Sequence, residues 1–481
     1  MGGLRSVQPE RTTLLTYRSQ AGRWALIVTI LGSGMAFIDG SAVNVALRAI
    51  SQDLGADLAD LQWVITGYLL TLGALVLVGG SLGDLYGKRK IFVVGVIWFA
   101  AASILCGLAW STTSLILFRI AQGVGAALLV PNSLALIQAV FVPADRATAI
   151  GIWSGFSGVT ALVGPFLGGW LTDAFSWRFV FLINPVLAAP TLLLALRFIP
   201  ETHIVPKARP DIAGGLTATI GLGAIVYALI EGPVRGWDDP AVIAAAVVGI
   251  VALVAFGAIE RTSDTPMVPF RIFSSRQFSG ANLYTLAVYA VLYGTFSFFF
   301  ALQLLNVLGY SALEAGLAAF VPVTLLLLII SPAAGRLATL IGPRIPMMVG
   351  PALSAGGAIW LAGISQGTPY WSGILPGVVL FGVGLGLLVT PLTATVLAAV
   401  SQEHVGLASG FNNSVARLAG LLAIVLIPLV AGLAGLQDLE GEAYSAGYER
   451  TMYISAGLLL LGTLIAGVTI REPLIEEEAP A

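Results

Sequence analysis

The chain has 481 residues, of which 57% are hydrophobic and only 10% are charged, and its formal net charge is -2. Soluble globular proteins carry about 25% charged residues, so this composition excludes an ordinary water-soluble protein. The balanced charge leaves no basic surface for nucleic acid. The single cysteine, Cys106, excludes a disulfide framework, a redox thiol pair and a zinc site built from cysteines.

Apolar runs separated by charged or turn-forming residues follow one another along the whole chain. A helix of about 20 residues crosses a hydrocarbon core of about 30 Å, so each run is long enough for one membrane span. The first 22 residues contain no apolar core, so we expect the first run to act as its own insertion signal. Fourteen membrane-spanning helices are predicted, over residues 23–48, 61–82, 91–110, 114–140, 148–173, 179–199, 212–231, 240–259, 279–307, 313–338, 345–364, 373–399, 406–434 and 452–470.

The basic residues are distributed unevenly between alternate loops. If the N-terminus is cytoplasmic, seventeen of the 23 Lys and Arg residues face the cytoplasm and four lie outside, namely Arg48, Arg178, Arg235 and Arg450. Because basic residues resist translocation, this asymmetry favours a multi-pass protein of fourteen spans with both termini in the cytoplasm. The absence of a targeting signal favours the plasma membrane. The other two, Arg119 and Arg417, fall within apolar runs. The longest outside loop, 435–451, collects acidic residues and is interpreted as a solvated loop.

Two loops repeat one pattern. GSLGDLYGKRK begins at Gly80 and GRLATLIGPR begins at Gly335, and both fit Gly-x-Leu-x-x-x-x-Gly-x-Arg. Each loop joins the second and third helices of a six-helix set, which predicts two halves related by an axis along the membrane normal. The expected organisation is a cytoplasmic tail (1–22), an N-terminal six-helix bundle (23–199), two inserted helices with cytoplasmic linkers (200–278), a C-terminal six-helix bundle (279–470) and a cytoplasmic tail (471–481).

Several segments in chain order resemble a known family. They are IDGSAVNVAL from Ile38, the loop from Gly80, RIAQGVGAA from Arg119, GVTALVGPFLGG from Gly158, WRFVFLINP from Trp177 and GFNNSVARLAG from Gly410. In these segments the chain is similar to the major facilitator superfamily, and specifically to its fourteen-span drug:proton antiporters. The resemblance covers nearly the whole chain. It departs from the family pattern at three positions, where Arg48 replaces a common proline, Leu85 replaces Arg, and Thr339 replaces Asp.

The resemblance implies an all-α integral membrane protein with fourteen transmembrane helices, in a major facilitator fold of two six-helix halves plus two inserted helices. It implies a proton-coupled efflux transporter that exports lipophilic drugs or related organic compounds by alternating access. Such a protein needs no cofactor or metal, because the proton gradient drives it. Its partners would be a small lipophilic organic substrate, protons and the lipid bilayer, and we expect it to function as a monomer. A proton-coupled or facilitative transporter of a specific metabolite or natural product is the alternative.

Two of these segments are implied to control the change of conformation. In the loop, glycines permit a tight turn, and the aspartate can pair with a nearby basic residue. The residues implied to control the conformation here are Gly80, Asp84, Gly87 and Arg89. In the fifth span, glycines let helices approach closely and proline bends the helix, and the implied residues are Gly164, Pro165, Gly168 and Gly169. From the residues alone, packing and gating remain equal interpretations of this fifth span.

Asp39 is the one acidic residue deep inside a predicted span. A carboxylate at membrane depth costs about 2.5–3.5 kcal/mol on insertion scales and is a functional candidate by default. At 1.5 Å per residue, Asp39 lies ~13 Å below the outer end of the first span, and Arg119 lies ~8 Å into the fourth span from the same side. We expect the two to meet in a central cavity and to carry proton coupling, because burial disfavours a charged carboxylate while an arginine favours it. A static ion pair that only fixes helix packing is the alternative. Glu231, Glu260 and Glu314, at span ends, are expected to face headgroups or loops.

The substrate candidates lie on several spans. Arg417, deep in the thirteenth span, needs a partner, and the options are a carbonyl of a broken helix, Asn412 or Asn413, or an anionic group on the substrate. The ninth span places Tyr289, Tyr293, Phe296, Phe300 and Gln303 on one helical stripe, a pattern more typical of packing than of binding. In the family that the chain resembles, however, this helix lines the cavity. The predicted substrate contacts are Asn44, Gln122, Asn132, Tyr289, Tyr293, Gln303 and Arg417. With one deep acid, neutral or singly charged lipophilic compounds are favoured over dications.

Other classes of protein fit the sequence less well. Gly-x-Ser-x-Gly occurs around Ser81 and Ser365, but neither copy has the strand-turn-helix context of a nucleophile motif. The sequence has no His or Cys cluster for a catalytic metal and no phosphate-binding loop for ATP. We therefore expect a protein that is not an enzyme. A receptor or scaffold is disfavoured because the loops are short, and an importer is disfavoured only through the resemblance.

Overall fold

The computed structural model describes residues 14–201, 211–263, 270–400, 405–436, 439 and 441–470. Within these ranges the backbone is helical apart from turns and one isolated bridge between Leu15 and Phe141. The first six long helices are α1 (Gln20–Leu54), α2 (Leu58–Tyr86), α3 (Lys88–Gly107), α4 (Thr112–Val140), α5 (Pro143–Ala174) and α6 (Arg178–Phe198).

The rest of the chain continues the same pattern with more irregular helices. An inserted pair, α7 (Ile212–Arg235) and α8 (Pro240–Thr262), precedes the short η1 (Phe270–Ser274). The next two spans are composite: α9 (Arg276–Tyr289) runs on through the π-helical η2 (Ala290–Phe300) and η3 (Gln303–Val307), and α10 (Ala312–Ala315) runs through η4 (Gly316–Phe320) into α11 (Val321–Ile341). The last four are α12 (Arg344–Ala362), α13 (Leu375–Ala398) preceded by η5 (Tyr370–Ile374), α14 (Val405–Ala431) and α15 (Glu442–Thr469).

The predicted spans agree with these helices. Thirteen helical segments of the described chain are long and apolar enough to cross a membrane. The remaining predicted span, 148–173, lies within α5, which has 32 residues. The all-α membrane fold is therefore confirmed, and the thirteen candidate spans of the described chain agree approximately with the fourteen predicted, whereas the exact domain boundaries stay predictions.

The outside loop predicted over 435–451 is wrong in its second half, because α15 already begins at Glu442. Tyr444 and Tyr448 are fully buried one helical turn apart, and the Tyr448 hydroxyl donates to the Leu361 carbonyl at 3.1 Å. Arg450 donates to the Ala431 carbonyl at 2.9 Å. The two buried tyrosines lie on a part of the helix that precedes the apolar run, and the charged residues Glu442, Glu449 and Arg450 on either side of them hide this pattern in the sequence.

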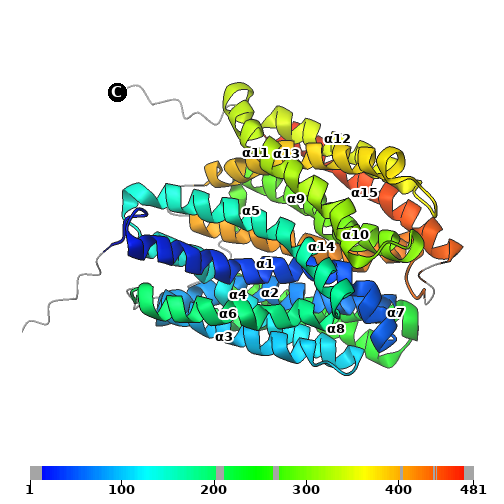
Figure 1. Cartoon of the computed structure of the whole chain (residues 1–481), viewed down its shortest axis with the longest axis horizontal. Helices are drawn as coiled ribbons and strands as arrows, with labels where there is room; N and C mark the ends of the chain where they lie inside the picture. Colours follow the sequence, from blue (N-terminus) through cyan, green and yellow to red (C-terminus); the bar gives the residue numbers. More distant parts are fainter. Residues whose placement is uncertain are drawn as a thin grey trace, which may run out of the picture.

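The helices form two groups of similar construction. In the first group α4 packs against α2 and α3, and in the second group α13 packs against the corresponding α11 and α12. Glycines permit both contacts: a Cβ at Gly125 would lie 2.7 Å from the Phe99 nitrogen, and a Cβ at Gly357 would lie 2.6 Å from the Phe381 nitrogen. Figure 1 shows α1–α4 and α6 in the lower part of the molecule, α11–α13 in the upper part, and α5 and α14 between them.

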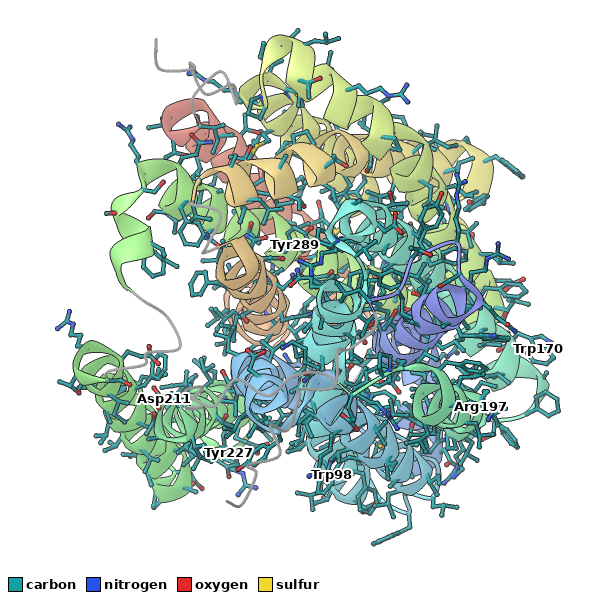
Figure 2. All side chains as sticks on the ribbon, turned by 90° about the vertical axis from the view of Figure 1, so that its left-hand side faces the viewer. Trp98, Trp170, Arg197, Asp211, Tyr227 and Tyr289 are labelled. Atoms are coloured by element: carbon teal, nitrogen blue, oxygen red, sulfur yellow. The ribbon has the colours of Figure 1, made fainter. Side chains whose placement is uncertain are left out.

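The inserted pair α7–α8 packs against α2 at the edge of the molecule (Figure 2, green). The Trp63 indole of α2 donates to Glu231 Oε1 of α7 at 3.2 Å, and Arg235 donates to Glu231 Oε2 at 2.8 Å. Glu231 therefore joins two helices and does not simply face headgroups. The expectation for Glu260 is also wrong, because this residue is only 3% exposed. It lies beside Gly214 of α7, where the close approach of α8 buries it.

Replacing Gly249 of α8 by valine is expected to destabilise the inserted pair. A Cβ at Gly249 would lie 2.7 Å from Ile225 Cγ1 and 2.9 Å from the Ile225 nitrogen of α7. Overpacking of this kind costs about 1–3 kcal/mol. We expect a lower unfolding temperature for the purified protein, followed by tryptophan fluorescence. Gly257→Val is the matched control, because no atom lies within 4 Å of a Cβ there; equal losses in both variants would contradict the packing account.

Candidate functional site

Asp39 and Arg119 form an ion pair buried inside the first group of helices. Arg119 Nη1 lies 2.5 Å from Asp39 Oδ2, and the exposed fractions of the two side chains are 1% and 0%. Asp39 lies near the middle of α1, and Arg119 lies two turns into α4. The structure thus brings together the two residues that are predicted from the sequence to carry proton coupling. Their role in coupling stays a prediction.

Amide side chains complete the coordination of the Asp39 carboxylate. Gln122 Nε2 donates to Asp39 Oδ1 at 2.8 Å, and Asn184 Nδ2 of α6 donates to the same oxygen at 3.1 Å. Gln122 also accepts from Arg119 Nη1 at 2.7 Å. Ser103 of α3 accepts from both amides, at 3.0 Å and 2.8 Å, and donates to the Phe181 carbonyl. The network therefore ties four helices, α1, α3, α4 and α6, to one carboxylate.

Arg119 has further partners on α2. Its Nε donates to the Val64 carbonyl at 3.0 Å, and its guanidinium lies 4.3 Å from the centre of the Tyr68 ring. The Tyr68 hydroxyl in turn donates to the Ala36 carbonyl of α1 at 3.2 Å. The ring of Tyr68 covers the guanidinium, and a buried charge pair of this kind is stable only while both partners stay charged and hydrogen-bonded.

Sequence reasoning missed three members of this network: Ser103, Asn184 and Tyr68. Small polar residues and tyrosine are common in membrane helices, so type alone does not single them out. The segment WRFVFLINP, which contains Asn184, carried the only usable signal, because it matches the family resemblance. Among the residues that the structure describes, no group of three or more His, Cys, Asp or Glu side chains fits a metal ion.

A second charged position lies on the other group of helices. Arg417 of α14 is half-buried, with its guanidinium 5.1 Å from the Tyr293 ring of η2 and 5.8 Å from the Phe37 ring of α1. The Tyr289 and Tyr293 rings contact each other at 5.3 Å. Arg417, Tyr289 and Tyr293 therefore lie together where α14, α9 and α1 meet. None of the three has a hydrogen bond or ion pair to another described residue.

The predicted aromatic stripe of the ninth span divides into two parts. Tyr289 and Tyr293 are half-buried beside Arg417, whereas Phe296 and Phe300 are buried within the second group of helices. Phe296 stacks on Phe381 of α13 with ring centres 4.5 Å apart. The spacing would place all of these residues on one face of an α-helix, but the backbone is π-helical over Ala290–Phe300 and so changes the register.

Several predicted substrate contacts face the interior of one group in this conformation. Gln122 is enclosed in the Asp39 network, and Asn44 is 4% exposed and donates to the Gly40 carbonyl of its own helix. Asn132 is fully buried and donates to the Gly79 carbonyl of α2 at 2.8 Å. Gln303 is fully buried and donates to the Ile364 carbonyl at 3.0 Å. A binding role for these four residues stays a prediction. Their hydrogen bonds within one group of helices give each of them a structural role in this conformation.

The charged residues of the loop between α2 and α3 form an ion pair and a hydrogen bond with neighbouring residues. Asp84 pairs with Lys88 one turn later. Arg89 donates to the Leu196 carbonyl of α6 at 3.2 Å and lies 3.8 Å from Glu201. Gly87 adopts φ +98°, a conformation that favours glycine, and Gly80 lies near Pro131 of α4. We call the end of the molecule that carries Lys88–Lys90 the basic end.

The glycine segment of α5 contacts the other group of helices at the end opposite the basic end. A Cβ at Gly169 would lie 2.5 Å from Leu313 Cα of α10, and one at Gly316 would lie 2.6 Å from the Pro165 carbonyl. Gly164 and Gly168 instead pack on α1, against Ser41 and Ala42 respectively. The proline and one glycine of the segment therefore seal the two groups together, and the other two glycines hold α5 on α1.

Three polar contacts support the same seal. Asp173, at the end of α5, accepts from the backbone nitrogens of Ala312 and Leu313 at 3.2 Å and 2.9 Å, and so caps the start of α10 across the two groups. Arg48 Nη1 of α1 donates to the Leu305 carbonyl of η3 at 2.5 Å. Gln62 Nε2 of α2 donates to the Ile424 carbonyl of α14 at 2.6 Å. The groups are thus joined at this end through side chain to backbone contacts.

Two helical groups of like construction, joined at one end and carrying charged side chains within long apolar helices, are typical of a polytopic membrane transport protein. The family model of the Major Facilitator Superfamily matches residues 29–424 and 285–481. The chain belongs to the Major Facilitator Superfamily. It is therefore a multi-pass membrane transporter of small organic substrates and not an enzyme.

Relatives and solved structures agree with this assignment. The chain is 35% identical to the puromycin resistance protein pur8 of Streptomyces alboniger, covering 93% of this chain and 91% of that protein. It is 33% identical to the cephamycin export protein CmcT of Amycolatopsis lactamdurans, covering 95% of each chain. A bacterial homologue of the human lysosomal transporter Spinster, solved in an inward-facing conformation, has a TM-score of 0.64 at 19% identity, covering 95% of this chain and 99% of that chain.

Proposed function

We propose that this protein exports lipophilic organic compounds from the cell in exchange for protons, by alternating access. The observation that carries the proposal is the Asp39–Arg119 pair, a titratable carboxylate with 0% exposure, held by donors from two other helices, α4 and α6. The names of the two relatives, which refer to antibiotic resistance and antibiotic export, favour efflux of such compounds over transport of one nutrient.

The proposed orientation follows from the positive-inside rule. The basic end would face the cytoplasm, which makes the sealed end external and the membrane a plasma membrane. Every residue of the proposed mechanism comes from one chain, so a monomer suffices. No cofactor is needed, because the proton gradient supplies the free energy.

In the proposed cycle, the external seal opens and a proton reaches Asp39. The neutral carboxyl no longer attracts Arg119, so the guanidinium loses its charged partner and the contacts of α4 with α1 and α2 rearrange. This rearrangement closes the external seal and opens the site toward the cytoplasm, where release of the proton restores the ion pair. Gln122 and Asn184 are positioning residues here, because both donate to Asp39 Oδ1 and so fix the orientation of the carboxylate.

The proposed function is tested by efflux from cells that lack their own exporters. Cells expressing this chain are loaded in turn with anionic, neutral and cationic members of a panel of lipophilic compounds, and the rate of loss from the cells is followed after the addition of glucose. We expect faster efflux than from cells with an empty vector, and collapse of the difference when a protonophore is added. Efflux that persists after complete collapse of the proton gradient would contradict proton coupling. Failure to move any of a broad panel of lipophilic compounds would contradict export.

A further inference from the structure

The two arginines within the apolar helices, the buried Arg119 and the half-buried Arg417, differ in how their charges are satisfied. Arg119 contacts a carboxylate, an amide oxygen, a backbone carbonyl and an aromatic ring. The guanidinium of Arg417 lies by the aromatic rings of Tyr293 and Phe37, and within the described ranges no acid or carbonyl accepts from it. At 1.5 Å per residue Arg417 lies ~18 Å from the first residue of α14, close to the middle of the helix.

The surroundings of Arg417 come from both halves of the protein. Tyr289 and Tyr293 lie on the ninth span, and Phe37 lies on α1. Gly73 of α2 is also close, because a Cβ at Gly73 would lie 3.7 Å from Arg417 Cβ. Phe37 also contacts the Trp153 ring of α5 at 6.5 Å. The hydroxyls of Tyr289 and Tyr293, like the guanidinium, donate to no described residue. Figure 2, viewed along the helices from the basic end, places Tyr289 inside the ring of helices.

The acid of the first half is not available to balance this charge. Asp39 already accepts from Arg119, Gln122 and Asn184, and its side chain is 0% exposed. Tyr68 lies between the helices at this level and covers Arg119. A cationic substrate that entered beside Tyr293 would therefore meet the positive charge of Arg417, and the deep carboxylate of the described helices, Asp39, would not be accessible to it.

We propose that the transported compounds carry an acidic group, a carboxylate or an acidic phenol, which binds Arg417 while their apolar body packs on Phe37, Tyr289 and Tyr293. A guanidinium binds a carboxylate through two parallel hydrogen bonds, and tyrosine hydroxyls add donors on the same side. Aromatic walls with a few polar groups suit an amphipathic ligand. This proposal rests on the export function above, because it names the substrate class for the same protein.

The test uses three probes with one aromatic body: pyrenebutyrate, pyrenebutyramide, and the pyrenebutyl trimethylammonium cation. Binding to the full-length protein in lipid nanodiscs is measured by fluorescence, with empty nanodiscs as the blank. We expect the wild type to bind the anion at least about tenfold more tightly than the amide, and the cation least, because charge-assisted hydrogen bonds are roughly twice as strong as neutral ones. Equal affinities, or a preference for the cation, would overturn the proposal without any variant.

Variants assign the preference to Arg417. Arg417→Gln is expected to weaken the anion about tenfold while leaving the amide within about twofold, and Arg417→Lys is expected to keep part of the preference. Arg197→Gln is the control, because Arg197 is exposed on α6 and lies well away from Tyr289 in Figure 2. An equal loss for all three probes in Arg417→Gln would mean that the residue only supports the fold.

The outcome is separable from that of the proposed function. If the protein exports neutral or cationic compounds in exchange for protons and shows no preference for the anion, the export function stands and the substrate class is wrong. If no compound of any charge moves, the export function itself fails, and binding of the anion would then describe a site without transport.

Discussion

Replacing Asp39 by asparagine is expected to abolish substrate-driven proton movement, down to the level of liposomes without protein. Asparagine keeps one oxygen for the donors that Gln122 and Asn184 direct at Asp39 Oδ1, so the local packing is retained. It cannot take up or release a proton. The variant also leaves Arg119 without its charged partner, and removing one member of a buried pair costs about 3–5 kcal/mol. We expect folding and membrane insertion with a lower unfolding temperature.

The double variant Asp39→Asn/Arg119→Gln separates coupling from stability. It removes both charges, so the buried network is neutral again and the loss of stability should be largely recovered. Proton movement should remain absent, because no carboxylate is left in the network. If the double variant regains proton-coupled transport together with stability, Asp39 and Arg119 form only a structural pair, and another residue carries the proton.

Replacing Gly169 by valine is expected to prevent closure of the seal and to stop transport. A Cβ at this position would lie 2.5 Å from Leu313 Cα and 2.7 Å from the Ala312 carbonyl oxygen, both of which are backbone atoms that cannot turn aside. An overpacking cost of about 1–3 kcal/mol acts only on the closed state. A bias of that size changes the ratio of closed to open molecules by about 5–150-fold.

The opening is measured by thiol labelling. Ala312→Cys places a thiol at a position that is 6% exposed, and the native Cys106 is fully buried and gives little background. An impermeant maleimide should label Ala312→Cys faster when Gly169→Val is also present. Gly151→Val is the matched control on the same helix, because no atom lies within 4 Å of a Cβ at Gly151. Unchanged labelling in the Gly169→Val background would contradict a gating role for this contact.

The membrane spans and the buried pair can be predicted from the sequence because charged residues are rare within the apolar runs of this chain. A charge within a hydrophobic run is costly, so Asp39, Arg119 and Arg417 stand out individually, and equal depth suggested that the first two meet. The structure places Asp39 and Arg119 in contact. Comparable reasoning works for the loop at Asp84, where the pattern contains its own basic partner, Lys88.

The remaining features depend on information that is not local. Ser103 and Asn184 are separated by 81 positions, and only the packing of α3 on α6 brings both to Asp39. The seal needs Asp173 to reach a backbone 139 positions away, at the start of α10, and a backbone nitrogen has no sequence signature. The division of the aromatic stripe depends on π-helical geometry, which the spacing of Tyr293 and Phe296 does not reveal.

We propose that Asp39 couples proton movement to substrate transport. The most direct measurement reconstitutes purified protein in liposomes that contain a pH-sensitive dye and adds a transported compound to one side. For the wild type we predict a change of internal pH that depends on the compound and is absent without protein, and for Asp39→Asn we predict no such change while the compound still binds. A pH change of undiminished size in Asp39→Asn would contradict the account.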